Sequence, residues 1–246
     1  MERRSGALTT RPFLTARWSN VVLLTFDAPE DLVRAQLAPG VEPDRWNGKT
    51  HASLVALEMR DVRVHGWRVP GFAGHPQVNF RVYARHGGQP AVTFVRELVP
   101  SRLIAAVGRL RYGEPFRAAR IAAHVVAGTD GVRAEYRFGL EAPRYRVGVA
   151  AARDGAVPPP TTFEHYLKER TYGCRADRRG RVRAFRVAHP PWAVRKVANV
   201  DYAVDFAALY GVEWEFLNRA TPVSTIFAEG SDVAVYPSRL TDSTSS

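Results

Sequence analysis

The sequence predicts a mainly β fold with a few short helices (α+β), arranged as an antiparallel barrel or sandwich. Many short segments alternate apolar and polar side chains, as a strand does when one of its faces is buried. Turn residues separate several of these segments at hairpin spacing, and no regular alternation of strand and helix supports a parallel sheet. The chain of 246 residues is 46% hydrophobic and 24% charged, so it can bury a sizeable core. We expect one domain over residues 1–240 and a polar tail over 241–246.

Two helices are predicted in the first half of the chain. Pro29 and the acidic residues after it favour a helix start, because a first turn accepts proline and negative charge. Ser101 can cap a second helix over residues 101–110, in which the apolar residues recur at helical spacing: Leu103, Ala106, Val107 and Leu110. Strands are predicted over 18–26, 52–59, 78–85, 91–98, 117–126 and 132–138, the last four as two hairpins. A loop containing Pro70 and Gly71 is predicted over 66–74.

The second half continues the same pattern. A strand is predicted over 144–150, followed by a loop over 154–160 that ends in three prolines. Thr162 is a helix cap for residues 163–168, and a third hairpin is predicted around Arg179 and Gly180. The remaining predicted elements are a strand over 199–204, a helix over 206–210, and strands over 223–227 and 233–236.

The strand around residue 80 has an unusual polar face. Asn79, Arg81 and Tyr83 alternate with apolar residues, so an amide, a guanidinium and a phenol share one side. A solvated face normally mixes Lys and Glu, whereas this composition is typical of a pocket wall. The guanidinium and its neighbours can clamp a carboxylate through two parallel hydrogen bonds. The alternative is an ordinary polar surface.

Two carboxylates are candidates for acid/base chemistry. Glu97 lies near the end of a predicted strand and Glu114 lies in a Tyr-Gly-Glu-Pro turn. A carboxyl group inside an apolar barrel has a raised pKa and can transfer protons near neutral pH. The alternative for each is an ion pair with one of the many arginines. Glu169, Arg170 and Tyr172 indicate a buried polar network between a helix and the barrel, which either supports the fold or lines the pocket.

The net charge of +11 and the pI near 10.4 raise the question of nucleic acid. All but three of the 35 basic residues are arginine, however, and they are spread along the chain. The densest run, residues 175–186, contains a turn and is predicted to wrap a hairpin. We therefore favour a solvated surface and anionic small ligands, and keep nucleic-acid binding through this hairpin as a less favoured alternative.

Several common sites are missing from the sequence. It has no phosphate-binding Gly loop, dinucleotide fingerprint or nucleophile elbow, and its seven histidines lack metal-ligand spacing, so we predict no metal and no cofactor. Cys174 is the single cysteine, which excludes an internal disulfide, and we expect a buried structural thiol. No signal-peptide h-region or membrane-length apolar window is present, so we expect a cytoplasmic protein without a membrane partner.

Five segments resemble the uncharacterised YqjF-like family of the acetoacetate decarboxylase-like superfamily. They are Phe13–Trp18, Leu37–Gly40, Asn79–Tyr83, Leu167–Tyr172 and His189–Trp192. The resemblance extends over nearly the whole chain and implies a cone-like antiparallel β-barrel with an internal pocket. It also implies that His189 and Trp192 belong to the pocket or to its supporting network.

The sequence departs from the decarboxylase in two ways. That enzyme uses a lysine that forms a Schiff base with a β-keto acid. This chain has no lysine between Lys49 and Lys168, so the region after the central hairpin cannot supply the amine. Gln77 stands at the position where the family has an acid. Decarboxylation by the known mechanism is therefore not expected, and Lys168 or Lys196 would restore it only if another strand carried the amine.

The sequence predicts a barrel that binds a small organic acid or carbonyl compound. Arg81 and Asn79 would hold the ligand oxygens, Tyr83 would donate a hydrogen bond, and Glu97 would carry protons without a cofactor. The alternative is a ligand-binding or sensor protein that uses the same pocket without catalysis. The sequence leaves the oligomeric state open, with a homo-oligomer as one alternative.

Overall fold

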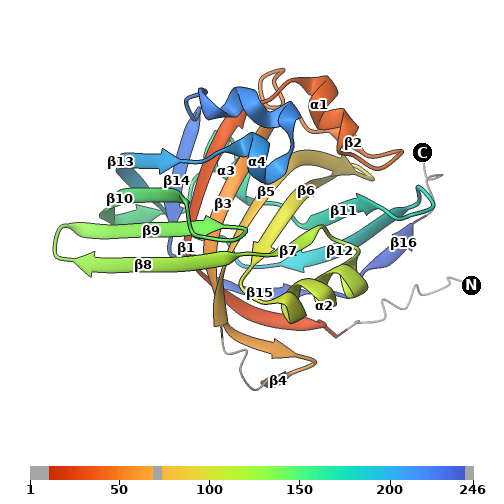
Figure 1. The fold of residues 1–246 in the computed structure, drawn as a ribbon, viewed down its shortest axis with the longest axis horizontal. Coiled ribbons are helices and arrows are strands. Elements are labelled where there is room, and N and C mark those ends of the chain that lie inside the picture. Colours follow the sequence, from red (N-terminus) through yellow and green to blue (C-terminus); the bar gives the residue numbers. More distant parts are fainter. Residues whose placement is uncertain (1–10, 69–73, 242–246) are drawn as a thin grey trace, which may run out of the picture.

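The alternating segments of the sequence become the strands of one long sheet in the computed structural model, which describes residues 11–68 and 74–241 (Figure 1). Within these residues the sheet has 16 strands. The strands are β1 (Leu14–Asp27), β2 (Glu42–Pro43), β3 (His51–Val64), β4 (Trp67–Arg68), β5 (Gly74–His86), β6 (Gln89–Val99), β7 (Phe116–Ala118), β8 (Arg120–Gly128), β9 (Gly131–Gly139), β10 (Tyr145–Ala156), β11 (Tyr172–Ala176), β12 (Val182–Ala188), β13 (Val194–Ala203), β14 (Ser224–Ala228), β15 (Asp232–Val235) and β16 (Arg239–Thr241). The helices are α1 (Glu30–Ala35), α2 (Arg102–Tyr112), α3 (Phe163–Lys168), α4 (Phe206–Tyr210) and the 3-10 helix η1 (Val212–Asn218). The predicted mainly β fold with few short helices is confirmed.

Seven of these strands close into a barrel. The hydrogen-bonded order is β3, β5, β6, β11, β12, β15 and β1, and β1 pairs with β3 to complete the ring. Most neighbours are antiparallel, but β6 and β11 run parallel. The predicted barrel is therefore correct, with one parallel contact that the hairpin pattern did not indicate.

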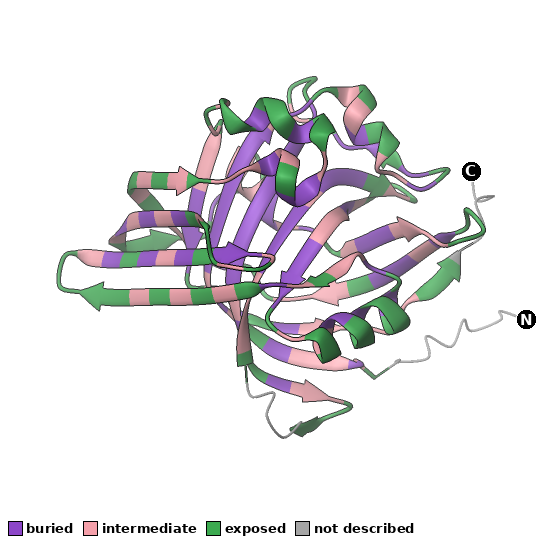
Figure 2. Ribbon diagram, in the orientation of Figure 1, coloured by how far each residue is buried: buried purple, intermediate pink, exposed green. Residues whose placement is uncertain are grey.

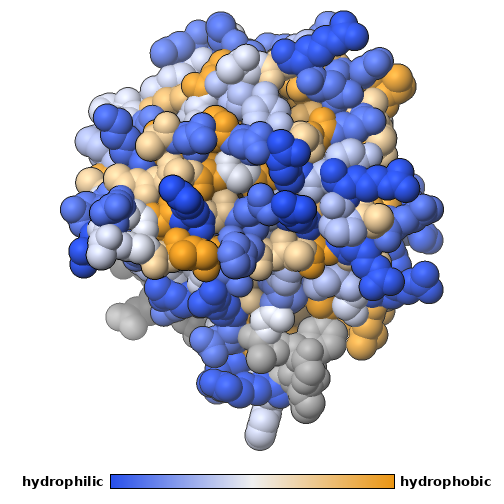
Figure 3. Space-filling view, turned by 60° about the vertical axis from the view of Figure 1, so that its left-hand side comes forward, coloured by the Kyte–Doolittle hydropathy of each residue, from blue (hydrophilic) through white to orange (hydrophobic). Residues whose placement is uncertain are grey.

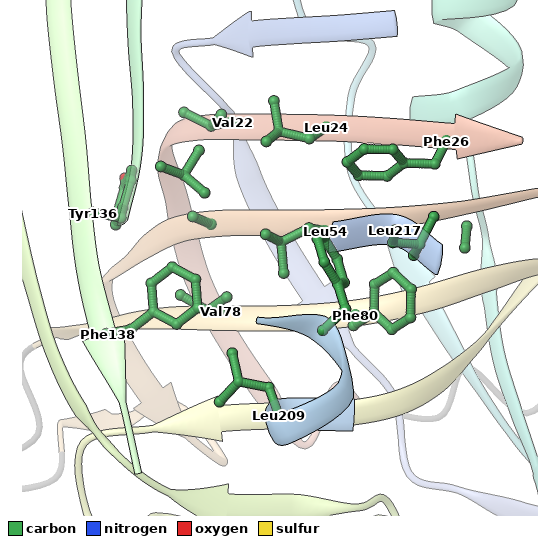
Figure 4. Packing of buried hydrophobic residues seen from close by; sticks show 14 of the residues in the cluster. Val22, Leu24, Phe26, Leu54, Val78, Phe80, Tyr136, Phe138, Leu209 and Leu217 are labelled. Atoms are coloured by element: carbon green, nitrogen blue, oxygen red, sulfur yellow. The ribbon is translucent and has the colours of Figure 1, made fainter. Parts of the chain in front are cut away.

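A second layer covers one side of the barrel. β1 also pairs with β14, and the sheet continues from there through β13, β10, β9 and β8. The largest hydrophobic core lies between this layer and the outer face of β1, β3 and β5. In Figure 4, Leu54, Val78 and Phe80 lie on these barrel strands, opposite Tyr136 and Phe138 of β9. The central strands are consequently buried on both faces and appear purple in Figure 2.

This arrangement decides which way β5 faces. Val78, Phe80 and Val82 point outward into the core under the second layer, and each is fully buried. Because side chains alternate along a strand, Asn79 and Arg81 point into the barrel. The apolar side of the strand faces protein, and the polar side faces the interior of the barrel.

Most predicted elements are present, with changes at their ends. β10 continues through Ala156, because residues 155 and 156 pair with β13, so the loop predicted over 154–160 begins later. The 3-10 helix η1 was not predicted. Trp67–Arg68 forms a short strand on β3, and Pro70 and Gly71 of the predicted loop lie outside the described residues. Thr241 ends β16, and the rest of the predicted tail also lies outside them.

Helix α2 begins where the sequence predicts, but its apolar stripe is exposed. The Ser101 hydroxyl accepts hydrogen bonds from the first-turn backbone, and Gly113 ends the helix in the left-handed conformation. The stripe residues Leu103, Val107 and Leu110 are 60%, 46% and 88% exposed. The helix instead packs through the buried residues Ala105, Gly108 and Tyr112. A Cβ on Gly108 would lie 2.4 Å from the ring of Phe116.

The described residues contain no helix that is long and apolar enough to cross a bilayer. On the face shown in Figure 3, strongly hydrophilic side chains are interspersed with apolar ones. The arginine-rich run forms the predicted β11–β12 hairpin, whose turn is held by the Asp177 carboxylate accepting backbone hydrogen bonds from Arg179 and Arg181.

Candidate functional site

The barrel encloses a cavity of about 420 Å³. Strands β1, β3, β5, β6, β11, β12 and β15 contribute to its wall, and α2 lies beside it. The lining is mainly aliphatic and aromatic. Its polar members come chiefly from β5, from the end of β6 and from the chain around α3: His75, Gln77, Asn79, Arg81, Glu97, Glu114, Lys168, Arg170, Tyr172 and His189. A mainly apolar cavity with a few convergent polar groups is the usual form of a small-molecule site.

Asn79 and Arg81 have unused hydrogen-bonding atoms in this wall. One terminal nitrogen of Arg81 donates a 3.1 Å hydrogen bond to the Leu167 carbonyl. Among the described residues, the buried Arg81 Nε and Asn79 Oδ1 have no hydrogen-bond partner. Buried polar atoms normally have partners, so these two atoms indicate a place where a ligand can bind.

Tyr83 lies behind the cavity instead of in its lining. It is fully buried, and its hydroxyl is 2.6 Å from the Ser53 hydroxyl, which is 2.7 Å from that of Thr25. The guanidinium carbons of Arg81 and Arg170 lie 5.6 and 4.8 Å from the centroid of its ring. The phenol that was expected to meet a ligand is thus bonded inside the protein, where it supports the two arginines.

Glu97 and Glu114 meet in the cavity from two different elements. Glu97 is opposite Asn79 in the β5–β6 ladder and accepts a 2.7 Å hydrogen bond from the Gln77 amide. Glu114 lies two residues before β7, which pairs in parallel with β6 beside Glu97. Both side chains are buried, and within the described residues neither carboxyl oxygen of Glu114 has a hydrogen-bond partner.

Burial controls the ionisation of this carboxyl pair. It raises the pKa of Glu114 to about 8, against the opposing charge of Arg175. Burial and then the neighbouring Glu114 raise the pKa of Glu97 well above its ordinary value, while the hydrogen bond from Gln77 lowers it. A carboxyl group with a pKa of about 8, as Glu114 has, can hold and release protons near neutral pH.

Arg170 belongs to a buried ion pair. Its guanidinium donates to the Asp44 carboxylate and lies 4.0 Å from the centroid of the Tyr166 ring. Both charged side chains are buried. This ion pair connects the end of α3 to the barrel, and Arg170 also lines the cavity. The two alternatives expected for it, structural support and pocket lining, are combined in one residue.

A second polar network lies beside it. The fully buried Lys168 amine pairs with the Glu169 carboxylate, whose other oxygen is 4.0 Å from His189 Nδ1. Trp192 Nε1 donates a 3.1 Å hydrogen bond to the same His189 nitrogen. Lys168, His189 and Trp192 line the cavity, as does Tyr172 on β11, whereas Glu169 lies behind them.

Lys168 is the cavity residue that sequence reasoning missed. Its amine was considered only if a strand carried it, but Lys168 is the last residue of α3 and reaches the interior from there. Its only signal in the sequence was its place in the segment that resembles the YqjF-like family. Helical periodicity gave no indication, because a lysine at a helix end is usually solvated.

The single cysteine, Cys174, is buried. Burial raises the pKa of the Cys174 thiol to about 12, so it is a poor nucleophile. Over residues 11–68 and 74–241, no three His, Cys, Asp or Glu side chains are grouped so that they could hold a metal ion.

Known proteins with this fold include enzymes. The acetoacetate decarboxylase-like enzyme from Sphingomonas wittichii RW1 superposes with a TM-score of 0.64 at 10% identity and covers 93% of each chain. The enduracididine biosynthesis enzyme MppR, solved with pyruvate, superposes with a TM-score of 0.63 at 16% identity over 97% of this chain and 94% of that chain. Identities this low establish the fold alone.

The sequence itself matches a family over most of its length. The uncharacterized protein YqjF of Bacillus subtilis (strain 168) is 21% identical over 226 residues, which are 90% of each chain. The family model DUF2071, described as an uncharacterized conserved protein, matches residues 15–232. The resemblance noted from the sequence is confirmed, and the chain belongs to the DUF2071 family.

Proposed function

We propose that the barrel cavity binds a small organic acid or carbonyl compound and that Glu97 and Glu114 transfer protons to and from it without a cofactor. The observation that supports this most directly is the Arg81 guanidinium, whose buried Nε has no partner among the described residues. Arg81 shares a strand face with Asn79, which is directly opposite Glu97. An anion-binding group and a proton-transferring group are therefore neighbours in one cavity.

The distribution of charge favours an anionic ligand at Arg81. Three cations line the cavity, but Arg170 is paired with Asp44 and Lys168 with Glu169. No ion pair of Arg81 is found within the described residues, and this residue is partly buried, where an unpaired charge is costly. A ligand carboxylate would supply the missing negative charge through a charge-assisted hydrogen bond.

The raised pKa values make the carboxyl pair compatible with this anion. A Glu114 with a pKa of about 8 is mostly protonated at neutral pH, so it does not repel a bound carboxylate. A protonated carboxyl can donate to a carbonyl oxygen, and its conjugate base can remove a proton from an adjacent carbon. The solved complex of MppR with pyruvate supports a 2-oxo acid as the first ligand to test.

Binding should be measured by calorimetry with pyruvate and acetoacetate on the wild type and Arg81→Ala. Arg60→Ala is the matched control, because Arg60 is an exposed arginine outside the cavity. We expect the Arg81 variant to lose at least tenfold in affinity, since a charge-assisted hydrogen bond contributes about 1.5–3 kcal/mol. Equal affinity in Arg81→Ala and the wild type would disprove this ligand position.

Proton transfer is tested separately from binding. NMR in deuterated water follows hydrogen exchange at the carbon beside the ligand carbonyl in the wild type, Glu97→Gln and Glu114→Gln. Acid/base chemistry predicts exchange that Glu97→Gln abolishes while binding persists. Binding without exchange in the wild type would instead identify a ligand-binding or sensor protein.

A further inference from the structure

We infer that the ligand is an amphiphilic acid, with its polar head at Arg81 and an apolar tail that extends along the barrel toward α2. This inference rests on the proposed function, because it uses the same head-group site. It specifies the ligand class, and three features of the cavity support it: its length, the segregation of its polar groups and the position of its opening.

The cavity is too long for a three-carbon acid alone. Both Arg81 and His75 of β5 line it, and six residues of strand correspond to roughly 20 Å. Its volume of about 420 Å³ lies in the range of sites for ligands of drug size. A pyruvate at Arg81 would leave most of this length unfilled.

The polar groups that β5 and β6 contribute near Arg81 occupy only one part of that length. Gln77, Asn79 and Arg81 lie on consecutive inward positions of β5, with Glu97 across from them. On the neighbouring strands, the lining beyond this level is apolar: Met59, Val62, Val64, Val187 and Val235. His75, the Tyr112 hydroxyl and His189 beside Trp18 are polar exceptions, and burial lowers the pKa of His75 to about 4, so it is neutral at pH 7. The wall therefore favours an uncharged, apolar ligand segment there.

Aromatic residues close the apolar end. Phe13, Tyr112 and Phe185 form one cluster with Val64, Val187 and Val235 packed against it. The ring centroid of Tyr112 lies 5.7 Å from the ring centroid of Phe13 and 5.1 Å from that of Phe185. Tyr112 is the last residue of α2, so this helix reaches the cavity at the aromatic cluster.

The opening of the cavity is apolar as well. Among the described lining residues, only Leu103 and Val107 of α2 are classed as exposed, at 60% and 46%. A residue that lines the cavity and is also exposed marks the place where the cavity opens to solvent. Leu110 extends the same stripe on the outside of the helix. A ligand with an apolar tail would be transferred from this exposed stripe into an apolar interior.

The test is a calorimetric chain-length series of straight-chain 2-oxo acids, from pyruvate through 2-oxohexanoate to 2-oxodecanoate, with 1-decanol as a ligand without the acid. We expect affinity to rise about fourfold per methylene until the apolar end is filled. Val235→Phe should shorten the tail space and weaken only the longest acids. Val126→Phe is the control, because Val126 is exposed on β8 and outside the cavity. Intact folding of each variant is checked by circular dichroism.

The outcomes separate this inference from the proposed function. Affinity that rises with chain length and falls in Arg81→Ala for every acid supports both. Binding of pyruvate that depends on Arg81, with no gain from longer chains, overturns the amphiphilic ligand and leaves the proposed function standing. If 1-decanol binds as tightly as the acid and Arg81→Ala changes neither affinity, the head-group position is wrong and both fail.

Discussion

The Gln77 amide donates a 2.7 Å hydrogen bond to the Glu97 carboxylate between neighbouring strands of the barrel wall. A carboxyl group in place of the Gln77 amide, beside Glu97 and Glu114, would add repulsion. The Gln77 amide instead lowers the pKa of Glu97, because its hydrogen bond stabilises the ionised carboxylate. Gln77 thus opposes the burial that raises the pKa of Glu97.

Replacing Gln77 by leucine should raise the pKa of Glu97 further. The substitution keeps much of the side-chain volume and removes the donor that stabilises the ionised form. The carboxyl stretching band in an infrared titration, assigned with Glu97→Gln, measures the change. Gln89→Leu at the exposed first residue of β6 is the control. An unchanged titration would show that the hydrogen bond does not set this pKa.

Glu114 should make the protein less stable as the pH rises. Its pKa is about 8 in the folded protein against an ordinary value of 4.5, so the folded state holds more protons between these values. The free energy of unfolding therefore falls by roughly 1 kcal/mol per pH unit from pH 5 to 8. In Glu114→Gln that slope should be reduced. Urea unfolding across this range measures it, with exposed Glu215→Gln as control; equal slopes in both variants would contradict the assignment.

Breaking the buried ion pair between Arg170 and Asp44 should be costly. Asp44→Asn removes the negative charge and leaves the guanidinium buried against the ring of Tyr166. Loss of one partner of a buried pair destabilises by about 3–5 kcal/mol. The matched variant Asp232→Asn breaks the exposed pair with Arg17 and should cost less than about 1 kcal/mol. Chemical denaturation compares the two, and similar losses would show that burial has no role.

Gly108→Ala should destabilise the protein, although alanine is the better helix former. The new Cβ would lie 2.4 Å from the Phe116 ring, so α2 or the ring has to move. Overpacking of this kind costs about 1–3 kcal/mol. Combining the change with Phe116→Leu should recover part of the loss, which a double-mutant cycle measures. A stabilised Gly108→Ala variant would mean that α2 moves freely over the cavity.

Lys168 is not expected to form a Schiff base. Its amine is paired with the Glu169 carboxylate, so this pair would have to break before the nitrogen could attack a carbonyl. Borohydride reduction with acetoacetate, followed by mass spectrometry, should give no adduct at Lys168. Lys196, which is exposed, serves as the internal reference for non-specific modification. A stoichiometric adduct at Lys168 that is absent at Lys196 would overturn this prediction.

The sequence alone predicts the local elements well. The hairpin of β5 and β6 and that of β8 and β9 each join strands through a short turn, so alternation and turn residues indicate them. The pairing of β1 with β3 and the parallel contact of β6 with β11 join segments far apart in the chain. No local pattern encodes those contacts, and they close the barrel.

The same division applies to the candidate site. Alternation along β5 places Asn79, Arg81 and Tyr83 on one face of the strand, so the sequence by itself determined which residues share that face. Only the tertiary structure decided that Tyr83 bonds to Ser53, that Lys168 enters from α3, and that Glu114 lies beside Glu97. The physical reason is that periodicity depends on neighbouring residues, whereas burial and partners depend on how distant strands pack around one cavity.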